Sequence, residues 1–292
     1  MKAMVLEQIC DMAEEREPLR AVERPEPEPG PGQVRIRVSA CGVCHTELDE
    51  IEGRTPPPEL PVIPGHEVVG RVDRLGAGVA AWKEGDRVGV GWIHSACGRC
   101  RHCREGEENL CRAFLATGRD ADGGYAEWMT VPERFAVAIP DSLSDTEAAP
   151  LMCAGAIGFR SLRLTGIADG NTLGLTGFGA SAHLVLKMVR HRFPRSRVHV
   201  FARREQERQF ALELGAVWAG DTADTAPEPL DAIIDTTPAW KPVVEALRNL
   251  RAGGRLVINA IRKEDGDKDQ LLRIQYPDHL WLEKEIKSVA NV

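Results

Sequence analysis

Residues 171–192 read NTLGLTGFGASAHLVLKMVRHR, and this stretch decides the fold. A short apolar run typical of a buried strand leads into GFGASA at Gly177–Ala182, and a helix-like segment follows directly. Gly177 permits a tight turn, Gly179 lets backbone approach a pyrophosphate, and Ala182 takes a close-packing position. GxGxxA alone also fits an ordinary glycine turn, but here it predicts dinucleotide binding by Gly177, Gly179, Ala180 and Ala182.

The alternation of strand-like and helix-like runs continues downstream. RVHVFA precedes REQERQFALELG, DAIIDTT precedes AWKPVVEALRNLRAG, and GRLVINA follows. This rhythm predicts a doubly wound parallel sheet of the Rossmann type over residues 154–292. Residues 1–153 instead hold short alternating runs such as GQVRIRVSA and HEVVGRVDRLG, broken by Gly and Pro, which predict an antiparallel, barrel-like β domain. We therefore expect an α/β protein with a β-rich N-terminal domain.

The residues after the second strand of the Rossmann half indicate which dinucleotide binds. The chain reads FARRE there, with the small neutral Ala202 where an acidic residue would bind the ribose hydroxyls, followed by Arg203 and Arg204. Two arginines suit a 2′-phosphate, so the pattern favours NADP over NAD. The alternative interpretation is two solvated arginines at the start of a helix.

Composition limits the classes of function. The 292 residues carry a formal net charge of −7, and no basic stripe stands out, so the chain is not expected to bind nucleic acid. The N-terminus lacks the apolar core of a secretory signal, and no uninterrupted apolar run reaches the length of a membrane span. We expect a cytoplasmic protein, in which the eight cysteines do not form structural disulfides and a dense cluster of them indicates metal ligation or catalysis.

Four of those cysteines are clustered in CGRCRHCREGEENLC, at Cys97, Cys100, Cys103 and Cys111. Overlapping CxxC pairs with a fourth cysteine predict a closed tetrahedral zinc site that clamps a polar lobe of about residues 94–112. Thiols packed as small hydrophobic groups fit poorly in so polar a segment. An iron–sulfur cluster is the other alternative, although its bacterial ferredoxin spacing differs at the last cysteine.

Further candidate ligands are scattered along the chain and are individually ordinary. ACGVCHTELD contains Cys44, VIPGHEVVG contains His66, and PLMCAG contains Cys153. Together with the four-cysteine loop, GGYAEW and GFGASA, these motifs occur in an order and spacing that resemble the zinc-dependent alcohol dehydrogenases of the medium-chain dehydrogenase/reductase superfamily. The resemblance covers essentially all 292 residues.

The resemblance implies a GroES-like catalytic domain joined to the Rossmann domain, with two zinc ions per chain. Cys44, His66 and Cys153 would ligate a catalytic zinc and leave one position open for substrate. Glu47 would orient the histidine ligand, and Glu67 would lie near the metal. The four clustered cysteines match the structural zinc lobe of the family, in agreement with their spacing.

The implied reaction interconverts alcohols and aldehydes or ketones by hydride transfer to NAD(P). Thr46 resembles the hydroxyl residue that binds substrate oxygen and starts a proton relay, although a threonine here can also bond to local backbone. Asp49 stands where many relatives end the relay with histidine. Trp92 resembles a pocket residue that favours short or slim alcohols, or else is a core residue. The segment CHTELDEIEGRTPPP resembles bacterial enzymes that act on primary aliphatic alcohols and their aldehydes.

Several alternatives and expectations stay open at this point. Polyol and amino-alcohol dehydrogenases share the framework, and a noncatalytic NAD(P)-binding redox sensor is another possibility. Relatives continue for several tens of residues that return to the catalytic domain, and this segment is expected to be absent from a chain ending at Val292. The family usually forms dimers or tetramers, so we expect a homodimer or homotetramer.

Overall fold

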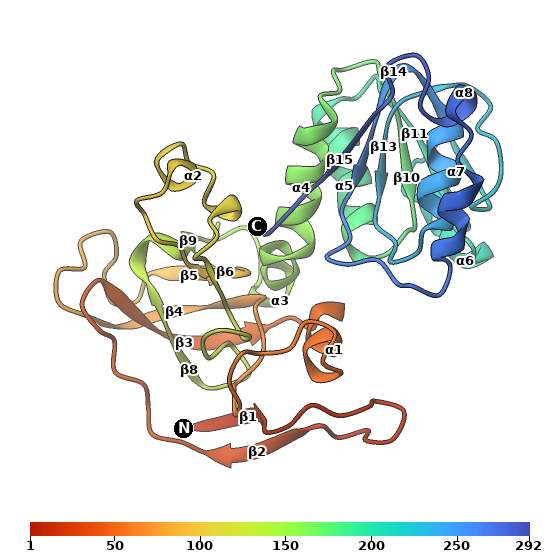
Figure 1. The fold of residues 1–292 in the computed structure, drawn as a ribbon. Helices are drawn as coiled ribbons and strands as arrows, with labels where there is room; N and C mark the ends of the chain where they lie inside the picture. The colour runs from red at the N-terminus through yellow and green to blue at the C-terminus, as the bar shows by residue number, and fades with distance from the viewer. The chain divides into compact units, whose positions relative to one another are not determined.

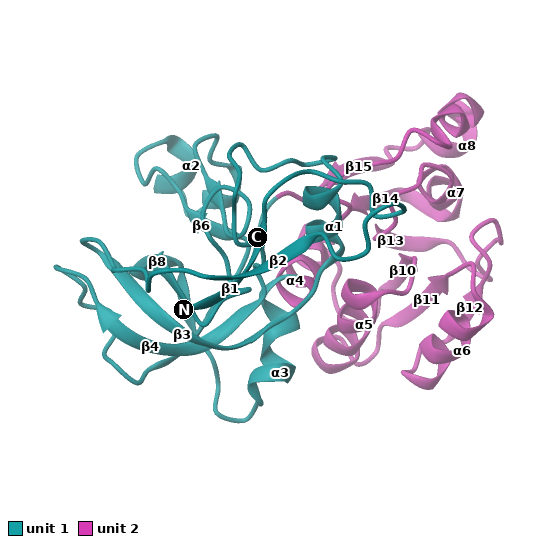
Figure 2. Cartoon of the chain, turned by 90° about the horizontal axis from the view of Figure 1, so that it is seen from below, with its two compact units in different colours: residues 1–153, 291–292 teal, residues 154–290 magenta.

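The computed structural model describes residues 1–292, whose contacts divide them into two compact units. The first unit comprises Met1–Cys153 with Asn291–Val292, and the second comprises Ala154–Ala290 (Figure 2). None of the helices combines the length and the hydropathy that crossing a bilayer requires. Each unit is described by itself below.

The first unit is built around a five-stranded antiparallel sheet in the order β8-β3-β4-β5-β9 (Figure 1). Two further strand pairs, β1-β2 and β6-β7, are also antiparallel. Buried aliphatic side chains from β3, β4, β5 and β8 form its main core. The strands are β1 (Lys2–Leu6), β2 (Leu19–Glu23), β3 (Gln33–Cys41), β4 (Val68–Leu75), β5 (Arg87–Val90), β6 (Ile93–Ser95), β7 (Leu115–Ala116), β8 (Trp128–Pro132) and β9 (Ala136–Ala138).

Helical segments in the first unit are short and lie between the strands. They are α1 (His45–Ile51), α2 (Arg101–Arg104), η1 (Glu108–Leu110), η2 (Glu133–Phe135), α3 (Asp145–Ala148) and η3 (Ala149–Met152). Both α1 and α3 begin with a capping box, in which a glutamate at the third helical position reaches back to the capping residue. The capping residue of α1 is Cys44, so the start of this helix determines where that thiol lies.

The second unit confirms the expected Rossmann-type architecture. Its six parallel strands lie in the order β12-β11-β10-β13-β14-β15, the doubly wound arrangement that reverses direction beside β10 (Figure 2). All five residues of β10 are buried, as expected for a central strand in a sheet whose two faces are covered. The strands are β10 (Thr172–Thr176), β11 (Arg197–Phe201), β12 (Trp218–Gly220), β13 (Leu230–Asp235), β14 (Leu250–Ile258) and β15 (Glu285–Ser288).

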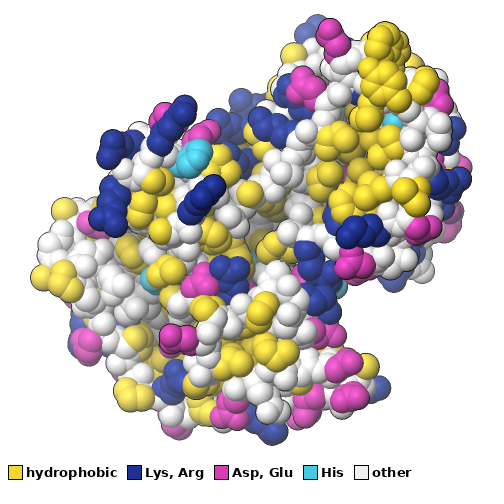
Figure 3. All heavy atoms as spheres, viewed as in Figure 1, with side chains coloured by type: hydrophobic (Ala, Val, Ile, Leu, Met, Phe, Trp, Pro, Cys, Tyr) yellow, Lys and Arg dark blue, Asp and Glu magenta, His cyan; other side chains and the backbone are white.

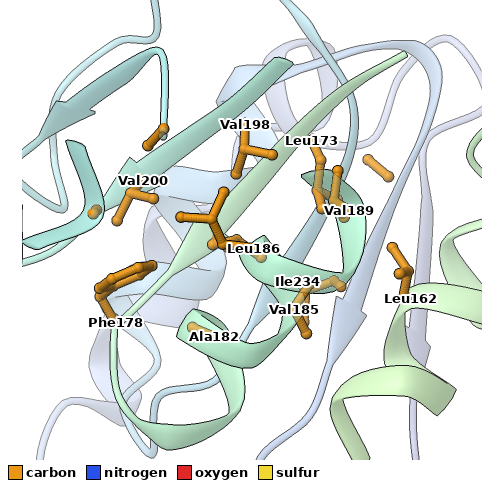
Figure 4. Close-up of a cluster of buried hydrophobic side chains, with 14 of the residues drawn as sticks. Leu162, Leu173, Phe178, Ala182, Val185, Leu186, Val189, Val198, Val200 and Ile234 are labelled. Carbon is orange, nitrogen blue, oxygen red and sulfur yellow. The ribbon is translucent and has the colours of Figure 1, made fainter. Parts of the chain in front are cut away.

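Helix α5 illustrates why these residues form this layer. Its buried residues Ala182, Val185, Leu186 and Val189 recur at helical spacing, and they pack against side chains of β10 and β11 such as Leu173 (Figure 4). Burial of each large aliphatic side chain contributes about 1.5–3 kcal/mol. The helical segments are α4 (Ala154–Thr165), α5 (Ala180–Arg192), α6 (Glu205–Glu213), α7 (Lys241–Asn249), η4 (Lys268–Arg273) and α8 (Tyr276–His279).

Candidate metal centres and nucleotide-binding edge

The first unit brings together ligand groups that are far apart in the sequence. Cys44 caps α1, His66 and Glu67 directly precede β4, and Cys153 follows η3. Their candidate ligand atoms all lie within 4.8 Å of one another. The three predicted catalytic zinc ligands therefore converge with Glu67, the carboxylate that the resemblance predicts near the metal.

Glu47 organises this cluster through both of its carboxylate oxygens. Oε1 lies 2.6 Å from Nδ1 of His66, and Oε2 accepts a hydrogen bond of 2.7 Å from the backbone N–H of Cys44. The Glu47 side chain is 3% exposed and the His66 side chain 1%, so both are shielded from water. Because Nδ1 of His66 is engaged by Glu47, Nε2 is the nitrogen available to a metal ion, and His66 also hydrogen-bonds Cys44.

The electrostatics of the cluster also suit a cation. The hydrogen bond from Cys153 lowers the pKa of Cys44 to about 3, despite the opposing effect of burial. The same interaction and burial raise the pKa of Cys153. Burial lowers the pKa of His66, but hydrogen bonds with Cys44 and Glu47 outweigh it and raise the pKa to about 10. A bound cation would replace these protons.

The donor set and its spacing fit zinc. Two thiols and one imidazole are common ligands of catalytic zinc sites, which keep a fourth position open. The Sγ atoms of Cys44 and Cys153 are 3.7 Å apart. Tetrahedral coordination with Zn–S bonds of about 2.3 Å requires a sulfur–sulfur separation of about 3.8 Å.

Glu67 can approach the cluster because residue 42 is glycine. A Cβ atom at Gly42 would lie 1.9 Å from Oε2 of Glu67, so any larger residue would displace the carboxylate. Burial, followed by the negative charge of Cys44, raises the pKa of Glu67 to about 7.

Thr46 lies beside the cluster, whereas Asp49 makes a different contact. The hydroxyl of Thr46 is 3.5 Å from Sγ of Cys44. Asp49 is not in the ligand cluster, and its buried carboxylate accepts a 2.6 Å hydrogen bond from Nε of Arg54. Its backbone carbonyl also accepts bonds from the N–H groups of Arg54 and Thr55, so Asp49 anchors the turn after α1.

Trp92 packs directly against a predicted ligand. Its ring meets that of His66 edge to face, with centroids 5.1 Å apart, and its Nε1–H donates to Asn291. The guanidinium of Arg119 lies over the Trp92 ring at 5.5 Å, a cation–π contact that sequence reasoning missed. Arg119 is 27 residues from Trp92, and no motif links the two positions.

The second cysteine cluster lies in the lobe around α2 and η1. The Sγ atoms of Cys97, Cys100, Cys103 and Cys111 lie within 4.8 Å of one another. The Cys100–Cys103 and Cys97–Cys103 separations are 3.5 and 3.9 Å, close to the edges of a zinc–thiolate tetrahedron. Backbone N–H groups of Arg99 and Cys100 lower the pKa of Cys97 to about 6, which favours the thiolate that binds metal.

In the second unit, the glycine-rich turn joins β10 to α5. Gly177 has a φ of +76°, which a side chain rarely tolerates, and its N–H donates to the Phe201 carbonyl at 2.8 Å. Gly179 caps α5, and a Cβ atom there would meet nothing within 4 Å. Ala182 is fully buried against the sheet, as its close-packing role requires. The helix N-terminus thus presents free backbone N–H groups beside open space.

The turn after β11 carries the two predicted phosphate-binding arginines. Arg203 and Arg204 are exposed, and Ala202 before them is buried. Nη1 of Arg208 donates to the carbonyls of Ala202 and Arg203 at 2.8 and 3.0 Å, so this third arginine fixes the turn. Sequence reasoning missed the role of Arg208. The sequence signal that could have revealed it is its position in the first turns of α6, close to Arg203 and Arg204.

Comparisons with known proteins show which families and structures this chain is similar to. The alcohol dehydrogenase GroES-like domain family matches residues 30–141. AdhA of Mycobacterium tuberculosis, named a probable alcohol dehydrogenase, is 46% identical over 259 residues, which span 87% of this chain and 73% of that protein. An alcohol dehydrogenase of Geobacillus stearothermophilus is 40% identical over 188 residues, which span 64% of this chain and 54% of that protein.

This chain is also similar to solved structures. A zinc-binding dehydrogenase from Sinorhizobium meliloti 1021, bound to NADP, is similar with a TM-score of 0.86 and 29% sequence identity. The similarity covers 99% of this chain and 84% of that one.

Proposed function

The chain belongs to the zinc-dependent alcohol dehydrogenase family and is an NAD(P)-dependent alcohol oxidoreductase, and from this premise we propose its site residues, preferred cofactor and substrate class. Cys44, His66 and Cys153 hold the catalytic zinc, and Cys97, Cys100, Cys103 and Cys111 hold a second, structural zinc. The observation that carries the proposal is the convergence of two thiols and an imidazole around one point, with Glu47 bound to the far side of the imidazole.

The two kinds of site call for different chemistry. Zinc held by three ligands supplies a Lewis acid that stabilises negative charge on a substrate oxygen. NAD(P) supplies the hydride acceptor or donor. The four-cysteine cluster has no remaining position for substrate, so its role is to hold the polar lobe around α2 together.

The chain's own residues prepare the reaction. Glu47 fixes the ring of His66 through Nδ1 and the backbone of Cys44 through its N–H, so both ligands keep their orientation. The Thr46 hydroxyl, next to Cys44 Sγ, would accept the alcohol proton and release its own hydroxyl proton to solvent water. Because Arg54 holds the Asp49 carboxylate, we propose that any contribution of Asp49 to the relay depends on that ion pair.

We propose NADP as the preferred dinucleotide. Arg203 and Arg204 are exposed on a turn that Arg208 holds in shape, and guanidinium groups bind phosphate through paired hydrogen bonds. No acidic side chain occupies position 202, where a carboxylate would bind the 2′-hydroxyl of NAD and repel a phosphate. The NADP in the Sinorhizobium meliloti structure supports this choice.

We propose small primary aliphatic alcohols and their aldehydes as substrates. The support is Trp92, whose bulky ring lies against His66 and so narrows the space next to the proposed catalytic metal.

We also propose a homodimer or homotetramer that uses β15, an outer strand of the parallel sheet. All four β15 residues are exposed, and Ile286 among them is 47% exposed. Exposed hydrophobic side chains gather over α7 and α8 of the same unit, Tyr276 and Trp281 among them (Figure 3). An exposed strand edge that carries an apolar side chain is a typical pairing surface. Sedimentation of the wild-type chain and of Ile286→Lys tests this, because only the wild type should associate.

An assay with both cofactors tests the reaction and the substrate class together. Linear primary alkanols, a polyol and an amino alcohol are each tested with NADP and with NAD, and bound zinc is measured on the same sample. We expect alkanol-dependent NADP reduction by protein that carries zinc in both clusters. Preference for the polyol or amino alcohol would overturn the substrate proposal, and zinc-loaded protein without hydride transfer to any substrate would overturn the reaction.

A further inference from the structure

The sheet of the second unit ends in a buried ion pair at its carboxyl edge. Asp235 is the last residue of β13, and Lys263 lies in the segment after β14. The Asp235 side chain is 0% exposed and the Lys263 side chain 9%. We propose that this pair, the Lys263–Asp235 clamp, positions the glycine-rich turn for dinucleotide binding, an inference that rests on the proposed NAD(P)-dependent function.

Asp235 joins the two central strands of the sheet. Its Oδ1 accepts hydrogen bonds from the hydroxyls of Thr176 and Thr237 at 2.6 and 2.8 Å. Thr176 is the last residue of β10 and directly precedes Gly177. The carboxylate therefore ties the start of the glycine-rich turn to the segment after β13.

Lys263 completes the arrangement from the other side. Its Nζ contacts Oδ2 of Asp235 and donates to the carbonyls of Thr237 and Ala239 at 2.8 and 3.0 Å. An ammonium group has three N–H donors, and these three acceptors engage all of them. Lys263 has no donor left for a phosphate, so it is a positioning residue and not a ligand of the dinucleotide.

The clamped segment supports the glycine-rich turn directly. The N–H and hydroxyl of Thr236 both donate to the Thr176 carbonyl, at 3.0 and 2.9 Å. A Cβ atom at Gly177 would lie 2.9 Å from Oγ1 of Thr236 and from Cγ2 of Thr237. The turn thus rests on Thr236 and Thr237, and a shift of these residues would be transmitted to Gly177.

Stability alone is a poor explanation for the clamp. Removing two charges from water is costly, and well-packed apolar residues often replace a buried ion pair without loss of stability. The ion pair instead restricts the conformation of the two segments that it joins, the one after β13 and the one after β14, next to the end of β10. Binding to a turn held in one conformation avoids the entropy of ordering it.

Two variants test the clamp, and dinucleotide binding is measured on each of them in addition to folding. Lys263→Met removes the three donors, and the double variant Asp235→Asn/Lys263→Met does so without a lone buried charge. Lys284→Met is the matched control, because Nζ of Lys284 also donates to two carbonyls, those of Leu247 and Asp278 at 2.8 Å. Leu247 lies in the last turn of α7, shortly before β14 begins at Leu250, at the opposite end of the sheet from the glycine-rich turn.

The measurement is direct binding of NADPH by fluorescence, followed by KM for NADP and kcat. If the released turn is competent roughly a tenth of the time, Kd and KM rise roughly tenfold in both clamp variants. At saturating NADP, kcat stays at the wild-type value. Lys284→Met binds NADPH like the wild type.

The possible failures are distinguishable. A folded clamp variant with wild-type Kd, or an equal loss in Lys284→Met, would overturn the inference while the proposed function stands. If Lys263→Met does not fold, the Kd of the double variant for NADPH tests the inference. Absence of NADPH and NADH binding by the wild-type chain would overturn the proposed function and this inference with it.

Discussion

Substitution of Glu47 by glutamine should weaken zinc binding at the Cys44–His66–Cys153 cluster and leave the four-cysteine cluster unchanged. Glu47 uses one oxygen for the N–H of Cys44 at 2.7 Å and the other for Nδ1 of His66 at 2.6 Å. Glutamine keeps one acceptor oxygen and replaces the other with an NH₂ group, which cannot accept. One of these two bonds is therefore lost.

The magnitude follows from the bond that disappears. A hydrogen bond to a charged group contributes about 1.5–3 kcal/mol. With about 1.4 kcal/mol for each factor of ten, zinc affinity at this cluster should fall by about 10- to 100-fold. The fold should survive, because glutamine has nearly the same shape and can keep one of the two bonds.

The assay is zinc content after equilibration in graded free-zinc buffers. Glu47→Gln should lose zinc from one cluster at a higher free-zinc concentration than the wild type. Glu147→Gln is the control, since Glu147 holds the same position in the capping box of α3 and lies outside both clusters. Wild-type zinc affinity in Glu47→Gln, or equal weakening in Glu147→Gln, would refute the reasoning.

The remaining predictions concern cofactor choice, the structural zinc, proton transfer and pH. The double variant Arg203→Ala/Arg204→Ala should raise KM for NADP by about 10- to 100-fold and leave KM for NAD nearly unchanged, measured by steady-state kinetics. Cys111→Ser should lose zinc from the four-cysteine cluster alone and lower the unfolding temperature, whereas unchanged zinc content would contradict that assignment. Thr46→Val should lower kcat by about 10²- to 10⁴-fold at constant zinc content, and Thr46→Ser should restore most of it. Burial lowers the pKa of His199 below its unfolded value of about 6.5, so its stabilising contribution is present above that value and is lost as pH falls through the folded pKa. Urea unfolding at about pH 7.5 and about pH 5.5 should therefore show a smaller loss of stability in His199→Gln than in the wild type.

Local patterns in the sequence predicted much of the fold. The apolar spacing of α5 and the short uncharged run TLGLT of β10 predict these two elements, because each pattern reflects which faces of one element are buried. The four-cysteine cluster was likewise predictable, since its members lie within a single loop. Its spacing already suits a tetrahedral metal site.

Contacts between distant residues were not predictable in this way. Cys44, His66 and Cys153 have no common spacing, and only the resemblance to a family grouped them. The Asp49–Arg54 ion pair and the Lys263–Asp235 clamp depend on how turns fold back onto their elements. Side-chain pairing of this kind is decided by tertiary packing and leaves no periodic signal in the sequence.

The most direct test is an anomalous difference map at the zinc absorption edge from crystals of the zinc-loaded chain. The account predicts a peak at about 2.3 Å from Sγ of Cys44 and Cys153 and about 2.0–2.1 Å from Nε2 of His66, besides a peak among the four clustered cysteines. A map with a peak only at the four-cysteine cluster, and Cys44, His66 and Cys153 without metal, would contradict the account.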